Sequence, residues 1–295
     1  MVKKINKVLF LYNPSSGKGK IKKNLGYIDQ ELRKKYGSVD IIESKSKSFM
    51  EETVKKACYE YDYIFFSGGD GTFNIVINSI PDIENLPIFG YLPGGSTNDM
   101  SYNLNISKDI KIGLKDLLSS TPQEYNVGSI GDTKFIYVAD FGAFTDVSHI
   151  TPQEQKRKFG RLAYLKYAIE ILFKGAKNHK VVVDGVVYET PLMFISNSRE
   201  VGNFRINPEK SQKDGLYYIV IVNGEKGHRI RNIVYLFIFG IEAAVNKNRA
   251  ITFTSPRFTL DCDVNEWDVD GEAVTIKFPV TCGYSGKKIR ILTNR

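Results

Sequence analysis

Three polar, glycine-rich turns each follow a predicted strand in the first part of the chain. They are residues 13–18 (Asn-Pro-Ser-Ser-Gly-Lys), 67–72 (Ser-Gly-Gly-Asp-Gly-Thr) and 93–99 (Pro-Gly-Gly-Ser-Thr-Asn-Asp). Glycine lets backbone amides approach a phosphate closely, and the N-terminus of a following helix adds a positive dipole. One such turn alone is typical of ordinary connecting chain. Three that follow strands of one parallel sheet predict a phosphate-binding edge.

Charged side chains in these turns suit a magnesium–phosphate group. Mg²⁺ accompanies phosphate donors, takes oxygen ligands and often keeps some of its waters. Asp70 and Asp99 stand where such an ion is expected, and Lys18 could neutralise phosphate charge. The sequence contains no GxxxxGK[ST] here and no GxGxxG after the first strand, which disfavours a Walker site and a dinucleotide site.

Two short segments in the second half could also carry chemistry. If residues 268–272 (Asp-Val-Asp-Gly-Glu) form a strand, three carboxylates share one face, and their repulsion favours a metal ion or substrate there. The alternative is an exposed hairpin, because Asp-Gly is a common turn. Residues 213–216 (Lys-Asp-Gly-Leu) predict, by themselves, only a turn into a strand.

Alternating strand and helix patterns must position the three turns. The patterns predict strands at 7–12, 39–42, 63–66 and 87–92, and helices at 20–36, 49–59 and from the second turn to residue 80. Such alternation indicates a parallel sheet that is covered by helices on both faces. The carboxyl ends of its strands, and so the turns, are expected at one edge.

From about residue 124 the pattern changes to strands with few helices. The predicted strands are 134–139, 180–183, 192–195, 216–222, 250–254, 259–262, 273–278 and 288–292, and the predicted helices are 159–175 and 230–245. This composition indicates an antiparallel β domain. The boundary is expected at a short hinge near residues 120–122 (Ser-Thr-Pro).

The combination of turns resembles the diacylglycerol kinase catalytic family, which includes bacterial lipid kinases and the sphingosine and ceramide kinases. Gly-Gly-Asp-Gly-Thr at 68–72 carries the likeness, with Asn-Pro-x-x-Gly upstream and Pro-x-Gly-Ser-x-Asn-Asp downstream. The resemblance implies a three-layer α/β ATP-binding domain with a mostly parallel sheet at 1–123. It also implies an antiparallel, β-sandwich-like lipid-substrate domain at 124–283, an active site in the interdomain cleft, and a tail, 284–295, that returns to the first domain.

The resemblance implies ATP-dependent phosphorylation of a lipid alcohol such as diacylglycerol, giving phosphatidic acid for phospholipid biosynthesis. By resemblance, Asp270 or Glu272 is the base for the lipid hydroxyl, and Asp70 is the rival base. Asp70 and Asp99 would position the catalytic Mg²⁺, partly through water. The implied nucleotide-binding residues are Asn13, Pro14, Ser15, Ser16, Gly17, Lys18, Ser44, Gly68, Gly69, Asp70, Gly71, Thr72, Ser96, Asn98 and Asp99.

The resemblance also implies a structural Mg²⁺ held by Asp214 and by the backbone carbonyls of Ser211 and Leu216. Lys213 stands beside that site, where many relatives have an acidic residue, and Ile75 stands where relatives usually have Glu. The alternatives are a sphingoid-base or other lipid kinase and a catalytically impaired nucleotide- or lipid-binding relative. An NAD kinase shares Gly-Gly-Asp-Gly but lacks the Asn-Pro-x-x-Gly segment.

Composition sets the remaining expectations. The chain has 295 residues, of which 42% are hydrophobic and 25% charged, which excludes a disordered or collagen-like chain and a bundle of membrane spans. Its three scattered cysteines indicate a reducing compartment and disfavour a cysteine zinc site.

The net charge of +8 favours anionic partners. The basic segment 156–180 predicts docking on anionic phospholipid, and the protein is expected in the cytoplasm at the inner membrane face. Because no recognisable nucleic-acid module occurs, a nucleic-acid partner is not expected. A homodimer is compatible with the sequence, which does not determine the oligomeric state.

Overall fold

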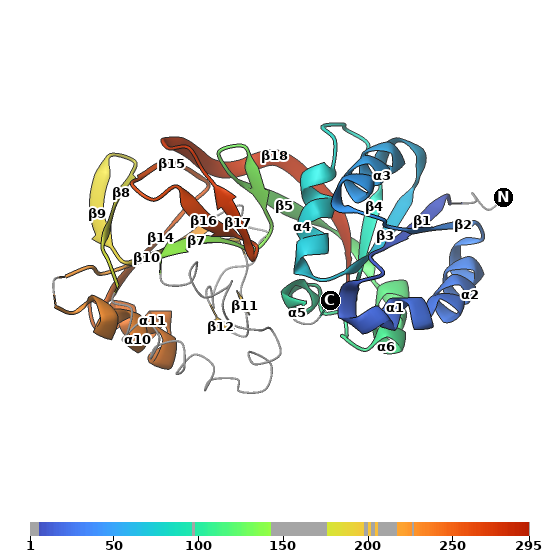
Figure 1. Ribbon diagram of the computed structural model, residues 1–295, viewed down its shortest axis with the longest axis horizontal. Coiled ribbons are helices and arrows are strands. Elements are labelled where there is room, and N and C mark those ends of the chain that lie inside the picture. The colour runs from blue at the N-terminus through green and yellow to red at the C-terminus, as the bar shows by residue number, and fades with distance from the viewer. Residues whose placement is uncertain are drawn as a thin grey trace. The chain divides into compact units, whose positions relative to one another are not determined.

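The computed structural model describes residues 6–95, 98–142, 176–197, 200–201, 204–205, 217–225 and 227–294. The chain divides into two compact units, which are coloured in chain order in Figure 1. Unit 1 comprises Met1–Asn126 and Gly286–Arg295, and unit 2 comprises Val127–Ser285. The strands β5 (Thr121–Ile130) and β18 (Val280–Thr293) each contribute residues to both units.

Unit 1 is a parallel sheet with helices on both faces. Its elements are β1 (Val8–Tyr12), η1 (Ser16–Gly19), α1 (Lys20–Lys23), α2 (Leu25–Tyr36), β2 (Val39–Glu43), α3 (Lys47–Glu60), β3 (Tyr63–Gly68), α4 (Asp70–Ser79), β4 (Ile88–Pro93), α5 (Asp99–Leu104) and α6 (Ile110–Ser119). The strand order is β2, β1, β3, β4 and then the end of β18, and each neighbouring pair is parallel. Figure 1 shows α3 and α4 together on one face, with α2 and α6 on the other.

Apolar patterning explains these layers. All five residues of β1 are buried, because the strand lies inside the sheet and helices cover both faces. Helix α2 buries Ile28 and Leu32, one turn apart, against the sheet side. Helix α3 begins where the hydroxyl of Ser46 accepts a hydrogen bond from the amide of Phe49 at 3.1 Å.

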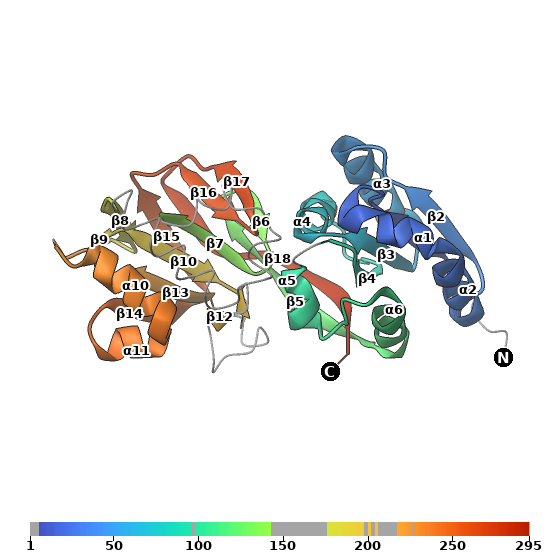
Figure 2. The ribbon, with the colours of Figure 1, turned by 60° about the horizontal axis from the view of Figure 1, so that its bottom comes forward.

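Among the described residues, unit 2 contains two large antiparallel sheets and one short two-stranded sheet, β11-β12. Its further elements are β6 (Thr133–Phe135), β7 (Val138–Gly142), β8 (His179–Val183), β9 (Val186–Thr190), β10 (Leu192–Ser196), β11 (Glu200–Val201), β12 (Phe204–Arg205), β13 (Tyr217–Val222), α10 (Arg229–Phe239), α11 (Ile241–Asn246), β14 (Ala250–Ser255), β15 (Arg257–Cys262), β16 (Glu266–Val269) and β17 (Glu272–Thr275). One sheet has the order β14-β13-β10-β7-β16-β17, and the other joins β18, β15, β8 and β9, with β5 and β6 beside β18. Helices α10 and α11 pack against β13 and β14 (Figure 2).

Side chains from both sheets form one core in unit 2. Trp267 of β16 is fully buried, and its ring centroid lies 4.9 Å from that of Phe141 and 5.7 Å from that of Phe278. The hydroxyl of Tyr217 on β13 donates a hydrogen bond to the carbonyl of Gly283 on β18 at 2.6 Å. The parallel sheet of unit 1 and the antiparallel sheets of unit 2 confirm the predicted fold class, an α/β part with a mostly parallel sheet followed by an antiparallel β part.

Most predicted elements are present, with ends shifted by a few residues. The helix predicted at 20–36 is divided at Asn24, and the helix predicted at 230–245 is divided at Gly240, which has a φ of 90°. Strands β5, β9, β11, β12 and β16 and helices α5 and α6 were not predicted, and the helix predicted at 159–175 lies outside the described residues. No helix among the described residues is both long and apolar enough to cross a membrane.

Candidate functional site: three turns in unit 1 and an acidic hairpin in unit 2

The three glycine-rich turns meet at one edge of the unit 1 sheet. Because β1, β3 and β4 are parallel neighbours, the turns that follow them lie at the same edge. The amide of Asn13 donates to the carbonyl of Ser67 at 3.0 Å, which joins the first turn to the second. The amide of Gly94 donates to the carbonyl of Gly68 at 2.8 Å, which joins the second turn to the third. The expected gathering of the turns is confirmed.

Close backbone packing between the turns requires glycine at two positions. Gly17 has a φ of 58°, and a Cβ atom there would collide with the carbonyl oxygen of Gly94. A Cβ atom on Gly95 would collide with the Cα atom of Gly69. The missing side chains therefore let the three turns pack backbone against backbone at this edge of the sheet.

Helix α4 begins directly at the second turn. Its N-cap residue, Gly69, has no side chain to cap the helix, and the amide of Phe73 donates to the Gly69 carbonyl at 3.0 Å. The amides before Phe73 lie in the first turn, where the helix dipole favours an anion. Asp70 lies half-buried in this first turn, and Thr72 accepts a hydrogen bond from the amide group of Asn13 at 3.4 Å.

Asn98 shapes the third turn from within. Its side chain is 2% exposed, and its Oδ1 accepts from the amide of Gly95 while its Nδ2 donates to the Gly95 carbonyl, both at 2.8 Å. The hydroxyl of Tyr91 lies 3.1 Å from the same Oδ1. Asn98 was expected only among the nucleotide contacts, so this positioning role was not predicted. The available signal is an Asn three residues after a glycine, since Asn side chains often bond nearby backbone.

A second polar cluster, also missed, fixes the turn after β2. The amide of Ser44 donates to the carbonyl of Tyr12 at 2.8 Å, and the Ser44 hydroxyl donates to the carbonyl of Ser46 at 3.0 Å. The Tyr12 hydroxyl donates to Glu43 at 2.5 Å, and Lys22 lies 3.2 Å from that carboxylate. Burial, and then the bond to Glu43, raises the pKa of Tyr12 to about 12, while bonds from Tyr12 and Lys22 hold the pKa of Glu43 below its usual range.

Some of the predicted site residues lie outside the described parts. The backbone of Lys18 lies in η1 and Asp99 opens α5, but their side chains are not described. The other undescribed positions are Ser96, Ser211, Lys213, Asp214, Leu216 and most of the basic segment 156–180. In the first turn, the amide of Ser15 donates to Oδ1 of Asn13 at 3.0 Å, which tightens the turn after β1.

Residues 268–272 form a hairpin, so the expectation of one strand face with three carboxylates is wrong. Val269 and Glu272 pair across a two-residue turn, in which Asp270 has a φ of 54° and Gly271 a φ of 88°. Positive φ at both positions is the type I′ conformation that Asp-Gly favours. The turn separates the carboxylates: Asp268 and Asp270 are buried, and Glu272 is exposed.

Backbone amides hold the carboxylate of Asp270. Its Oδ2 accepts from the amide of Ile136 at 2.7 Å, and its Oδ1 accepts from the amides of Tyr137 and Val138 at 3.0 and 3.1 Å. The Tyr137 hydroxyl donates to the Asp270 carbonyl at 2.7 Å. Bonds of this kind are strong because the acceptor is charged. They fasten the hairpin to residues 136–138 and disfavour Asp270 as the base, since both of its oxygens already accept.

Side chains able to ligate a metal are not gathered in the described parts of the chain. No three His, Cys, Asp or Glu side chains among these residues are grouped as a metal site. Asp140 and Asp268 lie opposite each other on β7 and β16, and Oδ1 of Asp268 accepts from the amide of Gly271 at 2.6 Å. Among the described side chains of the unit 1 turns, Asp70 is the carboxylate that could offer an oxygen to a divalent ion.

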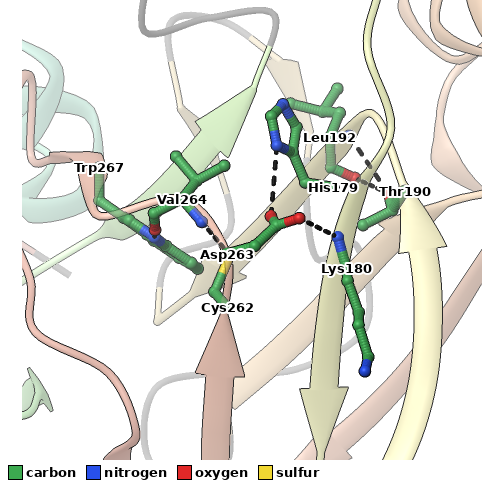
Figure 3. A network of polar contacts seen from close by, with 8 residues as sticks. All are labelled: His179, Lys180, Thr190, Leu192, Cys262, Asp263, Val264 and Trp267. Carbon is green, nitrogen blue, oxygen red and sulfur yellow. Dashed lines mark hydrogen bonds and ion pairs between the residues drawn. The ribbon is translucent and has the colours of Figure 1, made fainter.

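Figure 3 shows another polar cluster in unit 2, which is structural. The Asp263 carboxylate lies 3.3 Å from Nδ1 of His179 and accepts from the amide of Lys180 at 3.0 Å. Sγ of Cys262 accepts from the amide of Val264 at 3.4 Å. Burial raises the pKa of the Cys262 thiol to about 12, so it stays protonated at neutral pH and is a poor nucleophile. The cluster ties the start of β8 to the end of β15.

Comparisons with known proteins agree with this geometry. Residues 7–130 match the family model described as the diacylglycerol kinase catalytic domain. The chain is 27% identical over 218 residues to the diacylglycerol kinase of Bacillus subtilis (strain 168), covering 72% of each protein. It is 30% identical over 227 residues to the diacylglycerol kinase of Staphylococcus aureus (strain bovine RF122 / ET3-1), covering 74% of this chain and 72% of that protein.

Solved structures share the fold of the whole chain. Two crystal structures from Bacillus anthracis str. Sterne, one of them of a diacylglycerol kinase, superpose with TM-scores of 0.78 and 0.75 at 23% and 19% identity. They cover 99% of this chain, and this chain covers 97% and 98% of theirs. The family model spans all three turns, and the 30% identity extends over more than two thirds of both proteins. The chain therefore belongs to the diacylglycerol kinase family and is a lipid kinase.

Proposed function

We propose that this protein transfers the γ-phosphate of ATP to the free hydroxyl of diacylglycerol and so produces phosphatidic acid for phospholipid biosynthesis. The observation that carries the proposal is the packing of three glycine-rich turns at one sheet edge, with α4 starting from the second turn. Such an edge suits a polyphosphate. The curated relatives, named as diacylglycerol kinases, support the choice of acceptor.

The nucleotide end of the reaction needs alignment and neutralisation of charge more than covalent chemistry. Backbone amides of the turns after β1 and β3 bind the phosphates, with further contacts from Ser44 and Ser96. Lys18 neutralises phosphate charge. Asp70 and Asp99 would hold the Mg²⁺ that accompanies ATP, partly through water, and its charge offsets that of the phosphate oxygens.

The acceptor end needs a base. Glu272 removes the proton from the lipid hydroxyl, whose oxygen bonds to the γ-phosphorus while the bond from phosphorus to the leaving oxygen of ADP breaks. Glu272 is exposed and can receive a proton, whereas Asp270 is engaged by backbone amides and holds the hairpin. Asp70, in the first turn of α4, is the rival base.

Three further parts of the proposal concern residues outside the described ranges or the surroundings of the protein. Asp214 would hold a structural Mg²⁺ together with the backbone carbonyls of Ser211 and Leu216. The basic segment 156–180 contacts anionic phospholipid at the inner face of the membrane, with the protein in the cytoplasm. A homodimer is compatible with the proposed function, and a measurement of molecular mass in solution would test it.

A second candidate is a relative that binds nucleotide or lipid without turnover. Ile75, half-buried on α4, favours it, because an apolar side chain stands five residues from Asp70, where the resemblance leads one to expect Glu. A sphingoid base is the alternative acceptor for an active enzyme. Turnover of radiolabelled ATP with diacylglycerol, sphingosine and ceramide separates these candidates.

The test of the mechanism compares Glu272→Gln with Asp70→Asn, measuring turnover and ATP binding separately. Removal of a general base lowers turnover by about 100-fold or more. We expect Glu272→Gln to do so while ATP affinity stays within a few-fold. We expect Asp70→Asn to lower turnover and to weaken magnesium-dependent ATP binding. Glu266→Gln is the matched control, because Glu266 is exposed on the same hairpin and should leave both measurements unchanged.

Full turnover in a folded Glu272→Gln protein would exclude Glu272 as the base and leave Asp70 as the candidate. Loss of ATP binding in the same variant would instead place this carboxylate in the nucleotide site. If the wild-type protein consumes no ATP with any of the three lipids, the binding-only candidate replaces the kinase.

A further inference from the structure

The outer face of α10 exposes large apolar side chains at its C-terminal end. Ile238 is 47% exposed and Phe239 is 60% exposed, and the Phe239 ring centroid lies 4.5 Å from that of Tyr235. The opposite face is already packed, with Ile233 fully buried and Phe237 only 7% exposed. Packing among the described residues of unit 2 therefore accounts for the inward apolar residues of α10 but not for Ile238 and Phe239.

Local geometry presents these two side chains at a corner. Helix α10 ends at Phe239, Gly240 turns the chain with a φ of 90°, and α11 begins at Ile241. Figure 2 shows the two helices next to each other along one side of unit 2, and they are in contact. Two apolar side chains at an exposed corner can enter the apolar layer of a bilayer more easily than two on a flat protein surface.

Basic side chains accompany the apolar corner. Between Arg229 and Arg249 the chain carries four basic residues and one acidic residue, Glu242. The guanidinium of Arg249 lies 4.0 Å from the centroid of the Tyr235 ring, so one basic group lies directly beside the apolar face. The net positive charge of the segment from Arg229 to Arg249 is complementary to an anionic surface.

We propose that Ile238, Phe239 and the α10–α11 corner insert into the surface of an anionic bilayer, with the neighbouring arginines and Lys247 at the level of the lipid headgroups. Aromatic and aliphatic side chains on one face of a helix, bordered by Arg and Lys, are typical of an interfacial helix. The inference rests on the proposed function, because diacylglycerol resides in a bilayer. It names a surface different from the basic segment 156–180.

The first experiment uses a tryptophan reporter in the full-length protein. The chain has one tryptophan, Trp267, which is fully buried in unit 2. Phe239→Trp should shift its emission to shorter wavelength and be quenched by brominated acyl chains in vesicles of phosphatidylcholine and phosphatidylglycerol in equal parts. Tyr59→Trp is the matched control, since Tyr59 is 68% exposed on α3 of unit 1 and should not be quenched.

The second experiment measures vesicle affinity by sedimentation. Phe239→Ser should weaken binding to the same vesicles by about tenfold or more, because a buried Phe side chain is lost from the apolar phase. Arg231→Gln combined with Lys247→Gln should weaken binding to these vesicles but not to pure phosphatidylcholine vesicles, and salt should weaken the wild-type protein in the same way. Tyr59→Ser should bind like the wild type.

The two results can overturn the proposal independently of the kinase assignment. An unquenched Phe239→Trp, or a Phe239→Ser protein that sediments like the wild type, would overturn it. So would conversion of a dimer into a monomer by Phe239→Ser, which would assign the corner to a second copy of the chain. Turnover of a short-chain diacylglycerol dissolved in water should not change in Phe239→Ser. If the wild type binds vesicles but phosphorylates no diacylglycerol, the proposed function fails and the docking surface remains.

Discussion

At the scale of single residues, Asp270 and Glu272 differ in role although only Gly271 separates them. The buried Asp270 carboxylate accepts three backbone hydrogen bonds. In Asp270→Asn the side-chain NH₂ group replaces one of the two accepting oxygens, so at least one backbone N–H donor loses its acceptor. A buried donor left without an acceptor costs about 1–3 kcal/mol. We expect Asp270→Asn to lower the free energy of unfolding by that amount in urea, whereas the exposed Glu272→Gln changes it by less than about 0.5 kcal/mol. Equal urea unfolding midpoints for Asp270→Asn and the wild type would contradict the stabilising role of the Asp270 carboxylate.

The same pair shows what can be predicted from residue types. The Asp-Gly dipeptide was enough to raise the hairpin alternative, because it favours positive φ at both turn positions. The anchoring of Asp270 could not be predicted, since its donors, Ile136, Tyr137 and Val138, lie more than 130 residues earlier in the chain. Asn98 differs, because its partner Gly95 is local and the contact follows from a known preference of Asn.

At the scale of elements, the packing between turns can be tested with two glycines in one short helix. Gly17 and Gly19 both have positive φ, at 58° and 72°, so Ala at either position carries a backbone strain of about 1–2 kcal/mol. Only at position 17 would the added Cβ collide with Gly94; at position 19 it meets nothing within 4 Å. We expect Gly17→Ala to weaken ATP binding by about tenfold or more, corresponding to about 1.4 kcal/mol. Gly19→Ala should bind within a few-fold of the wild type in the same calorimetric titration.

A similar loss of ATP affinity in both variants would mean that backbone strain, not the contact between turns, controls nucleotide binding.

The gathering of the turns was predictable, because consecutive strands of a parallel sheet bring their carboxyl ends to one edge. The breaks at Asn24 and Gly240 were harder to predict, since the apolar spacing continues across each of them and supports one long helix. Strand β5 was missed because its first half is polar and exposed.

At the scale of the whole molecule, the single strand β18 contributes residues to both units. Its first part pairs with β15, and its last part pairs with β4 through Arg290 and Ile291. The change of pattern near residue 124 predicted the boundary. The returning tail was expected only through resemblance, because a strand that serves two units has no distinct composition. The two units are defined by their internal contacts. That each unit also unfolds by itself is a separate prediction.

The division can be tested with two core truncations. Ile291 in unit 1 and Leu260 in unit 2 are both fully buried strand residues, and Ala at either should cost about 2–5 kcal/mol. Trp267 fluorescence follows unit 2, and release of a bound fluorescent ATP analogue follows unit 1. Because the buried core cluster around Trp267 is made of unit 2 residues, we expect Ile291→Ala to lower the urea midpoint of nucleotide release and to leave that of Trp267 nearly unchanged. Leu260→Ala should do the opposite. If each variant shifts both midpoints equally, the chain unfolds as a single cooperative unit and β18 transmits the loss of either core to the other.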